Sequence, residues 1–199
     1  MEFEILRAEE ADVPAIYELM KAGKAGCSDA EWYSIDDVDY VRKHVDAESE
    51  TGFVLKARKR EDGSALTTGK ELAVDVIAGF LLVHFPGTSS DNMARYMNLA
   101  QSEYDHVTYM DSAAVDPKFR GNHLQQRLIL QAEEELKGTP YYHLMCTVHP
   151  ENQYSLNNMK KLGYQVVAKD RMYGGLPRLV LYKRLQYPYI TSPSTSNTK

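Results

Sequence analysis

The chain has 199 residues, 43% of them hydrophobic and 26% charged, which is typical of one globular domain and excludes a collagen-like or disordered chain. Lys and Arg number 23 and Asp and Glu 28, so the formal charge of -5 gives no general attraction to nucleic acid or anionic membranes. Two distant cysteines, Cys27 and Cys146, and scattered histidines predict no disulfide framework and no metal site. We expect a cytoplasmic protein without a membrane span.

The first third of the chain predicts a strand and two helices. The strand is expected over residues 3–7, and the first helix begins with Asp12 as N-cap and ends at Gly23. A second helix is predicted to begin near Ser34, because Asp37 follows at the capping-box spacing. Both helices therefore follow the first strand.

Two apolar runs, residues 52–57 and 74–83, predict a β-hairpin around a charged segment that contains glycine. A basic run from Lys56 to Arg60 lies at the end of the first of these strands. Because Glu61 and Asp62 follow directly, we interpret this run as a solvated strand end rather than a nucleic-acid-binding patch.

From residue 106 onward, predicted strands and helices alternate. The expected elements are strands at 106–115, 141–148, 164–168 and 178–184, and helices at 121–137 and 153–162. This order favours an α/β or α+β domain with a partly parallel mixed sheet. Residues 86–104 are expected to form a pocket-shaping connection with a short helix. Residues 186–199 are expected to be a flexible tail, which leaves 1–185 as the single domain.

The loop before the predicted helix 121–137 carries the strongest chemical signal. The loop contains Asp116, Pro117, Arg120 and Gly121 and follows Val115. The helix after it has an apolar face with a period of four residues: Leu124, Leu128, Ala132 and Leu136. The loop thus delivers a helix N-terminus to the end of a strand, where unpaired N–H groups and the helix dipole favour a pyrophosphate. Arg120 adds a bidentate donor. An ordinary strand-to-helix turn with an exposed arginine is the alternative.

Three motifs in order resemble the GNAT acyltransferase superfamily over residues 3–185. They are the loop from Asp116 to Gln125, the segment from Asn152 to Ser155 followed by Lys161-Leu162-Gly163-Tyr164, and the opening Ile5-Leu6-Arg7-Ala8 with Asp12. The resemblance implies a mixed central sheet of about six to seven strands flanked by about four helices. It also implies that acetyl-CoA is the co-substrate and that no metal is needed.

The resemblance implies a set of cofactor-binding residues along one strand, the loop and the next helix start. These are Ala113, Ala114, Val115, Arg120, Gly121, Asn122, His123, Leu124, Gln125, Asn152 and Ser155. A plain N-cap is the alternative role for Asn152. His123 and Gln125 stand where the family usually has Gly and Gly or Ala, so larger side chains there can weaken cofactor binding.

Asp111 is the candidate general base. Strand alternation predicts that Tyr109, Asp111, Ala113 and Val115 share one face, and the resemblance places the base or its water contacts at the positions of Asp111 and Tyr109. A carboxylate there can remove a proton from the attacking ammonium. A buried aspartate that binds nearby backbone is the alternative.

The residue at the position of the family's general acid departs from the family pattern. Met159 stands where many members carry the tyrosine that protonates the leaving thiolate, and methionine has no proton to donate. Tyr164 is the candidate replacement as general acid. The alternatives are that Tyr164 is only an aromatic residue of the core, and that water supplies the proton. Tyr173 and Arg178, around a glycine turn, are candidate acceptor contacts, although an ordinary turn and strand-end arginine explain them equally well.

The sequence therefore predicts an N-acetyltransferase that moves an acetyl group from acetyl-CoA to a primary amine by direct attack in a ternary complex. The acceptor is a small molecule or a peptide, with no nucleic acid or membrane as partner, and a homodimer is an open possibility. A non-catalytic acyl-CoA-binding or regulatory domain is the alternative, which the departures at Met159, His123 and Gln125 favour.

Overall fold

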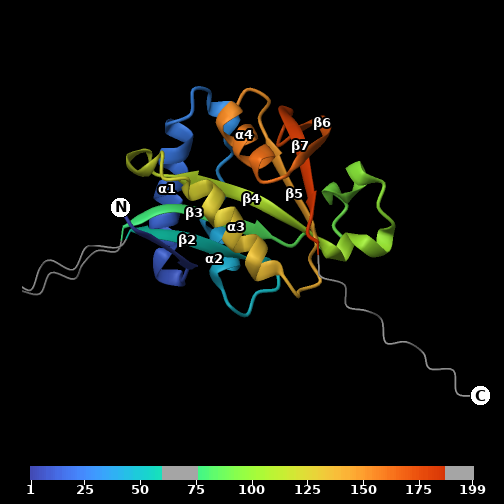
Figure 1. Ribbon diagram of the computed structural model, residues 1–199, viewed down its shortest axis with the longest axis horizontal. Coiled ribbons are helices and arrows are strands. Elements are labelled where there is room, and N and C mark those ends of the chain that lie inside the picture. Colours follow the sequence, from blue (N-terminus) through green and yellow to red (C-terminus); the bar gives the residue numbers. More distant parts are fainter. Residues whose placement is uncertain (60–75, 187–199) are drawn as a thin grey trace, which may run out of the picture.

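A seven-stranded mixed sheet organises the computed structural model, which describes residues 1–59 and 76–186 (Figure 1). The strands are β1 Phe3–Arg7, β2 Gly52–Lys59, β3 Ile77–His84, β4 Val107–Val115, β5 His143–Val148, β6 Gln165–Met172 and β7 Leu176–Arg184. Their order is β1-β2-β3-β4-β5-β7-β6, and only β4 and β5 pair in parallel. The predicted mixed sheet and the antiparallel pairing of β2 with β3 are confirmed.

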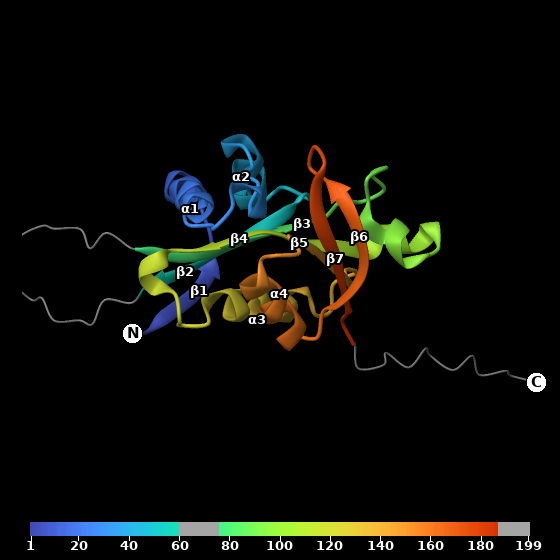
Figure 2. The same cartoon turned by 90° about the horizontal axis from the view of Figure 1, so that it is seen from above.

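Helices cover both faces of this sheet. They are α1 Val13–Ala25, α2 Val38–Val45, α3 Leu124–Leu136 and α4 Gln153–Lys161. Figure 2 shows α1 and α2 on one side of the strands and α3 and α4 on the other. Within the described residues, no helix is long and apolar enough to cross a membrane.

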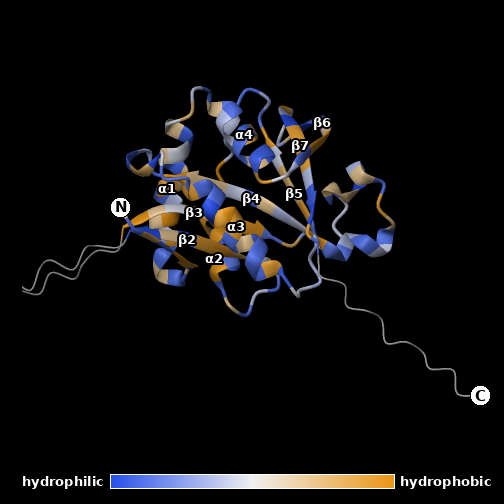
Figure 3. Ribbon diagram, in the orientation of Figure 1, coloured by the Kyte–Doolittle hydropathy of each residue, from blue (hydrophilic) through white to orange (hydrophobic). Residues whose placement is uncertain are grey.

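Each helical layer buries its own apolar stripe. The stripe predicted for α3 is confirmed, since Leu124, Leu128, Ala132 and Leu136 are all buried. Full burial of one such leucine contributes about 1.5–3 kcal/mol. A separate cluster joins α1 and α2 to the opposite sheet face through Ile16, Met20 and Val41, among others. Figure 3 shows both apolar and polar residues along α3, whereas β5 is largely apolar.

The parallel pair β4 and β5 separates along its length. Ladder pairs join Val107 to His143, Thr108 to Leu144 and Tyr109 to Met145, and none is formed further along. Beyond this point β4 continues to Val115 beside β3, while β5 continues to Val148 beside β7. The two strands therefore part and leave room between their carboxyl ends.

A β-bulge interrupts β4 at Asp111. Leu82 of β3 pairs with Ser112 and Val83 with Met110, so Asp111 is an extra residue in the ladder. As a result Asp111 and Ser112 both reach the α1–α2 side, through hydrogen bonds with Tyr40 and Tyr33. Ala113 and Val115 instead pack against the core cluster on the α3 side. The prediction that Asp111, Ala113 and Val115 share one face was wrong, because strict alternation fails at a bulge.

The connection between β3 and β4 contains two 3₁₀ helices, Met93–Met97 and Gln101–His106. Met93 and Ala94 are buried against Met145 and Val180 of β5 and β7, and Tyr96 donates a hydrogen bond to Asp170 of β6. The short helix predicted between residues 86 and 104 is thus confirmed, and it packs on the sheet beside β6. The pocket-shaping role expected of this connection is not found, because none of its residues lines the main cavity.

Several element boundaries differ from the sequence prediction. Helix α1 continues past Gly23 to Ala25, α3 begins at Leu124 rather than at residue 121, β5 begins at His143 rather than at residue 141, and β7 begins at Leu176 rather than at residue 178. Helix α2 begins at Val38 rather than near Ser34, because the Asp37 side chain accepts a hydrogen bond from the Tyr40 N–H at 2.7 Å and caps the helix itself. Strand β6 extends to Met172 because it pairs with β7 along its length. Arg60, the charged hairpin segment through residue 75 and the predicted tail beyond residue 186 lie outside the described residues.

Candidate functional site

A cavity of about 770 Å³ lies where β4 and β5 separate, and α3, α4 and the α1–α2 connection complete its walls. Most predicted site residues line it: Asp111, Ala113, Ala114, Val115, Arg120, Gly121, His123, Leu124, Gln125, Asn152 and Ser155. Tyr109, Asn122, Tyr164, Tyr173 and Arg178 are not among the described residues that line it. One cavity therefore joins the predicted cofactor loop to the predicted base.

The N-terminus of α3 opens into this cavity without a side-chain cap. The first helical hydrogen bond runs from the Arg127 N–H to the His123 carbonyl at 3.0 Å, so the N–H groups of Leu124, Gln125 and Gln126 have no acceptor within the helix. Such groups, with the helix dipole behind them, stabilise an anion. This donor set fits the pyrophosphate of a CoA thioester.

His123 adopts a backbone conformation that glycine favours. Its φ is 56°, in the left-handed region, and Gly121 two residues earlier has φ of 84°. The His123 side chain is exposed, so it does not fill the loop. A left-handed φ explains why glycine is the usual residue in the family, and a histidine there stores strain of about 1–2 kcal/mol.

Arg120 and Gln125 reach across the cavity to different walls. One guanidinium nitrogen of Arg120 lies 3.0 Å from where a Cβ would stand at Gly26, so a side chain at Gly26 would displace it. Gln125 donates to Ser155 Oγ at 3.3 Å and accepts from Asn158 Nδ2 at 2.7 Å. The Gln125 side chain is therefore directed to α4 and leaves the backbone of the loop uncovered.

Asn152 and Asn122 make local hydrogen bonds. Asn152 caps α4, its Oδ1 accepting from the Ser155 N–H at 3.1 Å, and its side chain still lines the cavity. Asn122 donates from Nδ2 to the Phe119 carbonyl at 2.9 Å, which fixes the turn before α3. The N-cap expected as the alternative for Asn152 is thus present.

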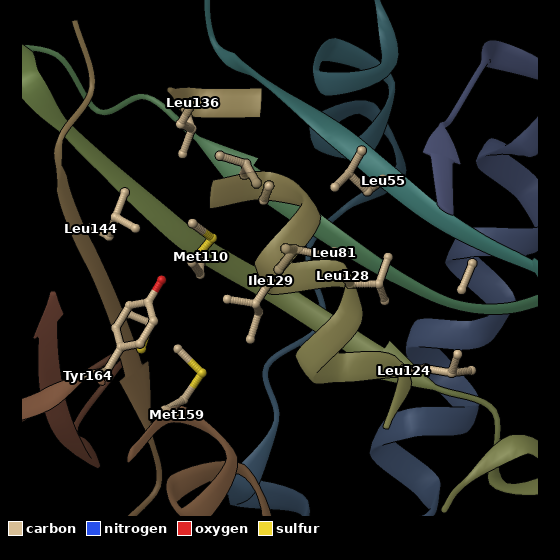
Figure 4. Close-up of a cluster of buried hydrophobic side chains, with 14 of the residues drawn as sticks. Leu55, Leu81, Met110, Leu124, Leu128, Ile129, Leu136, Leu144, Met159 and Tyr164 are labelled. Carbon is tan, nitrogen blue, oxygen red and sulfur yellow. The ribbon is translucent and has the colours of Figure 1, made fainter. Parts of the chain in front are cut away.

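Figure 4 shows Met159 and Tyr164 together in the apolar core beneath α3. Met159 is buried and lines the cavity, so its position matches the motif although its side chain has no proton. Tyr164 is 2% exposed, and its hydroxyl has no hydrogen-bond partner within the described part of the chain. Burial raises the pKa of Tyr164 well above its ordinary value. Tyr164 therefore has the position of an aromatic residue of the core, which was the alternative to its role as general acid.

The other end of the cavity carries Asp111 and a set of tyrosines. Tyr40 of α2 donates its hydroxyl to Asp111 Oδ2 at 2.8 Å, and the Tyr33 hydroxyl lies 2.6 Å from Ser112 Oγ. Burial raises the pKa of Asp111, and the hydrogen bond from Tyr40 opposes that rise. A carboxylate with a raised pKa is a stronger base once it is ionised.

Asp36 is a second carboxylate, in the α1–α2 connection, and it is not among the described residues that line the cavity. Burial and the nearby charge of Asp111 raise the pKa of Asp36 to about 6, against a hydrogen bond with Ser112 that lowers it. Asp111 thus faces Tyr40 of α2, and Ser112 faces Tyr33 of the α1–α2 connection. The sequence analysis did not single out Asp36, because no spacing relates it to a residue 75 positions later.

Tyr109, Tyr173 and Arg178 lie near the Asp111 end of the cavity but are not among the described residues that line it. The Tyr109 hydroxyl accepts a hydrogen bond from the Met93 N–H at 2.6 Å. Tyr173 lies in the turn between β6 and β7, with its hydroxyl 3.2 Å from Thr147 Oγ1. Arg178 is 3% exposed and donates to the carbonyls of Pro177 and Glu31 at 2.9 Å. Arg178 therefore holds the α1–α2 connection in place rather than presenting a free charge.

An aromatic pair, Trp32 and His149, joins two walls of the cavity and was also missed in the sequence. The rings stack with centroids 6.1 Å apart and planes 24° apart. Trp32 belongs to the α1–α2 connection, whereas His149 follows β5. Neither residue belongs to a periodic stripe or to a motif, so only the fold brings them together.

Comparison with known proteins agrees with this geometry. The sequence profile of the acetyltransferase (GNAT) family matches residues 28–164, which span the α1–α2 connection, the cavity strands, α3 and α4. The chain belongs to the GNAT acetyltransferase family. This confirms the predicted family and the predicted enzyme class, an acyltransferase of the GNAT type. No curated protein matches the sequence.

Solved structures of two N-acetyltransferases and of a protein bound to acetyl-CoA share the fold at low sequence identity. The Escherichia coli ribosomal-protein-S18-alanine N-acetyltransferase is 14% identical, with a TM-score of 0.63 over 96% of this chain and 99% of its own. Arabidopsis thaliana NAA60, solved with acetyl-CoA, is 12% identical, with a TM-score of 0.69 over 92% of this chain and 100% of its own. An N-acetyltransferase of Staphylococcus aureus Mu50 is 16% identical, with a TM-score of 0.62, over 94% and 100% of the two chains.

Proposed function

We propose that this GNAT enzyme transfers an acetyl group from acetyl-CoA to a primary amine, by direct attack of the amine within a ternary complex. The observation that carries the proposal is the single cavity that joins the uncapped N-terminus of α3 to the carboxylate of Asp111. One end supplies anion-binding N–H groups and the other supplies a base. The alternative, a domain that binds acyl-CoA without catalysis, needs only the first of these ends.

The cofactor end would hold the CoA moiety through the main chain. The N–H groups of Leu124, Gln125 and Gln126 would bind the pyrophosphate, with Arg120 adding charge. The free edge of β4 at Ala113 to Val115, where β5 has separated, offers backbone groups to the amides of the pantetheine arm. Acetyl-CoA, when bound, supplies the acetyl group as a thioester that an unprotonated amine attacks.

Asp111 would act as the general base. A primary amine enters mainly as an ammonium near neutral pH, and it must lose a proton before its nitrogen attacks. The Asp111 carboxylate accepts that proton while the Tyr40 hydroxyl holds Oδ2 in place. The new N–C bond forms as the C–S bond breaks, and the nitrogen gives its second proton to water in the cavity.

The leaving thiolate takes one proton, and Met159, which stands at the family's acid position and lines the cavity, has no proton to donate. The burial of Tyr164 away from the cavity removes support for Tyr164 as the donor. We therefore assign this proton to water in the cavity. A thiol has a pKa near 8.5, so its anion leaves readily without a dedicated acid.

Calorimetry with acetyl-CoA, followed by thiol release in the presence of a pool of small amines and peptides, tests the proposal. We expect binding, and we expect thiol release only when an amine is present. Binding without release for the whole pool favours the non-catalytic alternative. The absence of binding contradicts the assignment of the cofactor end, whatever the acceptor.

A further inference from the structure

Residues 31–33 of the α1–α2 connection span the gap where β4 and β5 separate. On one side of the gap, the Tyr33 hydroxyl lies 2.6 Å from Ser112 Oγ of β4. On the other side, the Trp32 ring stacks on the ring of His149, which directly follows β5. Trp32, Tyr33 and His149 all line the cavity. We call residues 31–33 the strap, because they connect the two sides of the gap at the acceptor end.

The strap is held at a third point by β7. The Glu31 carbonyl accepts a hydrogen bond from the Arg178 guanidinium at 2.9 Å. That guanidinium lies 5.3 Å from the centre of the Tyr173 ring, and the Tyr173 hydroxyl lies 3.2 Å from Oγ1 of Thr147 in β5. The strap, the turn between β6 and β7, and the end of β5 are therefore joined to one another around the acceptor end.

The strap shields the residues that it contacts from solvent. His149, Arg178 and Ser112 are between 3% and 5% exposed. The Trp32 indole N–H is also buried, and it has no hydrogen-bond partner within the described part of the chain. Because no polar contact holds this ring, its position depends on packing against His149. Trp32 thus presents an apolar surface to the cavity.

In the proposed reaction, the amine has to fit between this apolar surface and two polar groups. Its nitrogen must lie within hydrogen-bonding reach of Asp111 and beside the thioester carbon, at the free edge of β4. Asp111 directly precedes Ser112, which contacts Tyr33 of the strap. The carbon that bears the amine therefore lies against the strap.

We infer that Trp32 is a specificity-determining residue, which admits a primary amine on an unbranched CH₂ carbon and excludes one on a branched carbon. The inference rests on the proposed function, because it assigns the acceptor class of that same site. A CH₂ group passes a flat wall with only hydrogen atoms toward it, whereas a methyl branch on the same carbon collides with the indole ring. Small alkylamines and the end of a lysine side chain meet this requirement. A peptide N-terminus other than glycine does not, because its α-carbon is branched.

Propylamine and propan-2-amine test this shape requirement, because they have the same atoms and charge and differ only in branching at the carbon next to nitrogen. Thiol release from acetyl-CoA is measured with each amine. Each kcat/KM is then divided by the rate constant of the uncatalysed reaction of that amine with acetyl-CoA, which removes the difference in intrinsic reactivity. We expect the corrected ratio to favour propylamine about thirtyfold, the size of effect that one misplaced carbon has in a close-packed pocket. A corrected ratio near one, or a preference for propan-2-amine, would overturn the inference.

Trp32→Ala removes the wall, and Trp32→Phe is its conservative counterpart, since a phenyl ring can still stack on His149. We expect Trp32→Ala to reduce the corrected ratio to about threefold or less, and Trp32→Phe to keep it above about tenfold. Tyr17→Ala is the matched control, because it also removes an aromatic ring, but from α1 and outside the cavity lining. It should leave the ratio at the wild-type value. The ratio is the readout because a merely structural loss lowers both rates alike.

His149→Ala tests the stacked pair itself. Without the imidazole, the Trp32 ring loses the partner that holds it at the gap, so we expect the corrected ratio to fall to about threefold or less here too. The double variant should fall no further than Trp32→Ala alone, because both substitutions remove the same wall. A wild-type ratio in Trp32→Ala or in His149→Ala would overturn the inference.

Failure of this inference is distinguishable from failure of the proposed function. If acetyl-CoA binds but neither isomer is acetylated, the inference is overturned, while the larger pool of amines and peptides still tests the enzyme. If acetyl-CoA does not bind, both fail. If Trp32→Ala does not fold, as judged by circular dichroism, the wild-type ratio and His149→Ala still decide the inference.

Discussion

The two ends of the cavity recognise their ligands by different means. At the cofactor end the donors are backbone N–H groups at the start of α3 and the free edge of β4, with Arg120 as the main charged side chain. At the acceptor end the polar groups are side chains, chiefly Asp111 and Tyr33, and Tyr40 of α2 holds Asp111 from behind through a hydrogen bond. The first end depends on how the chain folds locally, and the second on which residues the fold brings together.

This difference explains which departures from the family pattern the site tolerates. His123 and Gln125 replace small residues, yet the backbone still opens into the cavity, because one side chain is exposed and the other is bound to α4. A single substitution at the acceptor end removes a functional group outright. We therefore expect catalysis to be sensitive to side chains and cofactor binding to be comparatively tolerant.

The largest effect is expected for Asp111→Asn. The amide keeps the hydrogen bond with the Tyr40 hydroxyl but cannot take a proton from the amine, so kcat/KM should fall about a thousandfold, as for loss of a general base. Acetyl-CoA affinity, measured by calorimetry, should stay within about twofold, because Asp111 is at the other end of the cavity. A matching loss of affinity would show that the two ends are not separate.

Arg120→Ala should give the next largest effect, on binding rather than on catalysis. Loss of one charge-assisted contact to phosphate should weaken acetyl-CoA binding about tenfold. Trp32 is the only tryptophan of the chain and lines the cavity, so its fluorescence reports binding directly. Lys118→Ala, on the same turn but outside the cavity lining, is the control and should leave the titration unchanged.

A smaller effect is expected from the backbone of the phosphate loop. His123→Gly and His123→Ala both remove the imidazole, but only glycine adopts a φ of 56° without strain. The glycine variant should exceed the alanine variant by about 1 kcal/mol in free energy of unfolding, measured by urea titration. Equal stabilities would mean that the left-handed conformation is not retained in solution.

The smallest effect on activity is expected for Tyr164→Phe. Its hydroxyl is buried without a hydrogen-bond partner among the described residues, and Tyr164 is not one of the described residues that line the cavity, so kcat should stay within about twofold. Stopped-flow measurement of thiol release provides the test. A loss of a hundredfold or more would restore Tyr164 as the general acid and contradict the assignment of that proton to water.

The sequence predicts the cofactor end better than the acceptor end. The apolar stripe of α3, its preceding loop and Asn152 as N-cap are local patterns, which a single segment of chain determines. The contacts of Tyr33 with Ser112 and of Tyr40 with Asp111 span 79 and 71 residues, and no periodicity encodes them. The face of Asp111 was predicted wrongly because the bulge depends on the register between β3 and β4.

The bulge at Asp111 changes which side of the sheet the side chains after it face. An ordinary strand gives each side of a sheet every second residue, whereas this one gives the α1–α2 side a carboxylate and a hydroxyl in succession. Removal of a single residue from the bulge would leave every sequence motif intact and restore alternation, which would put Asp111 and Ser112 on opposite sides. Family members that share the same sequence motifs can therefore differ in acceptor chemistry, because one inserted residue in this strand changes which side chains face the site.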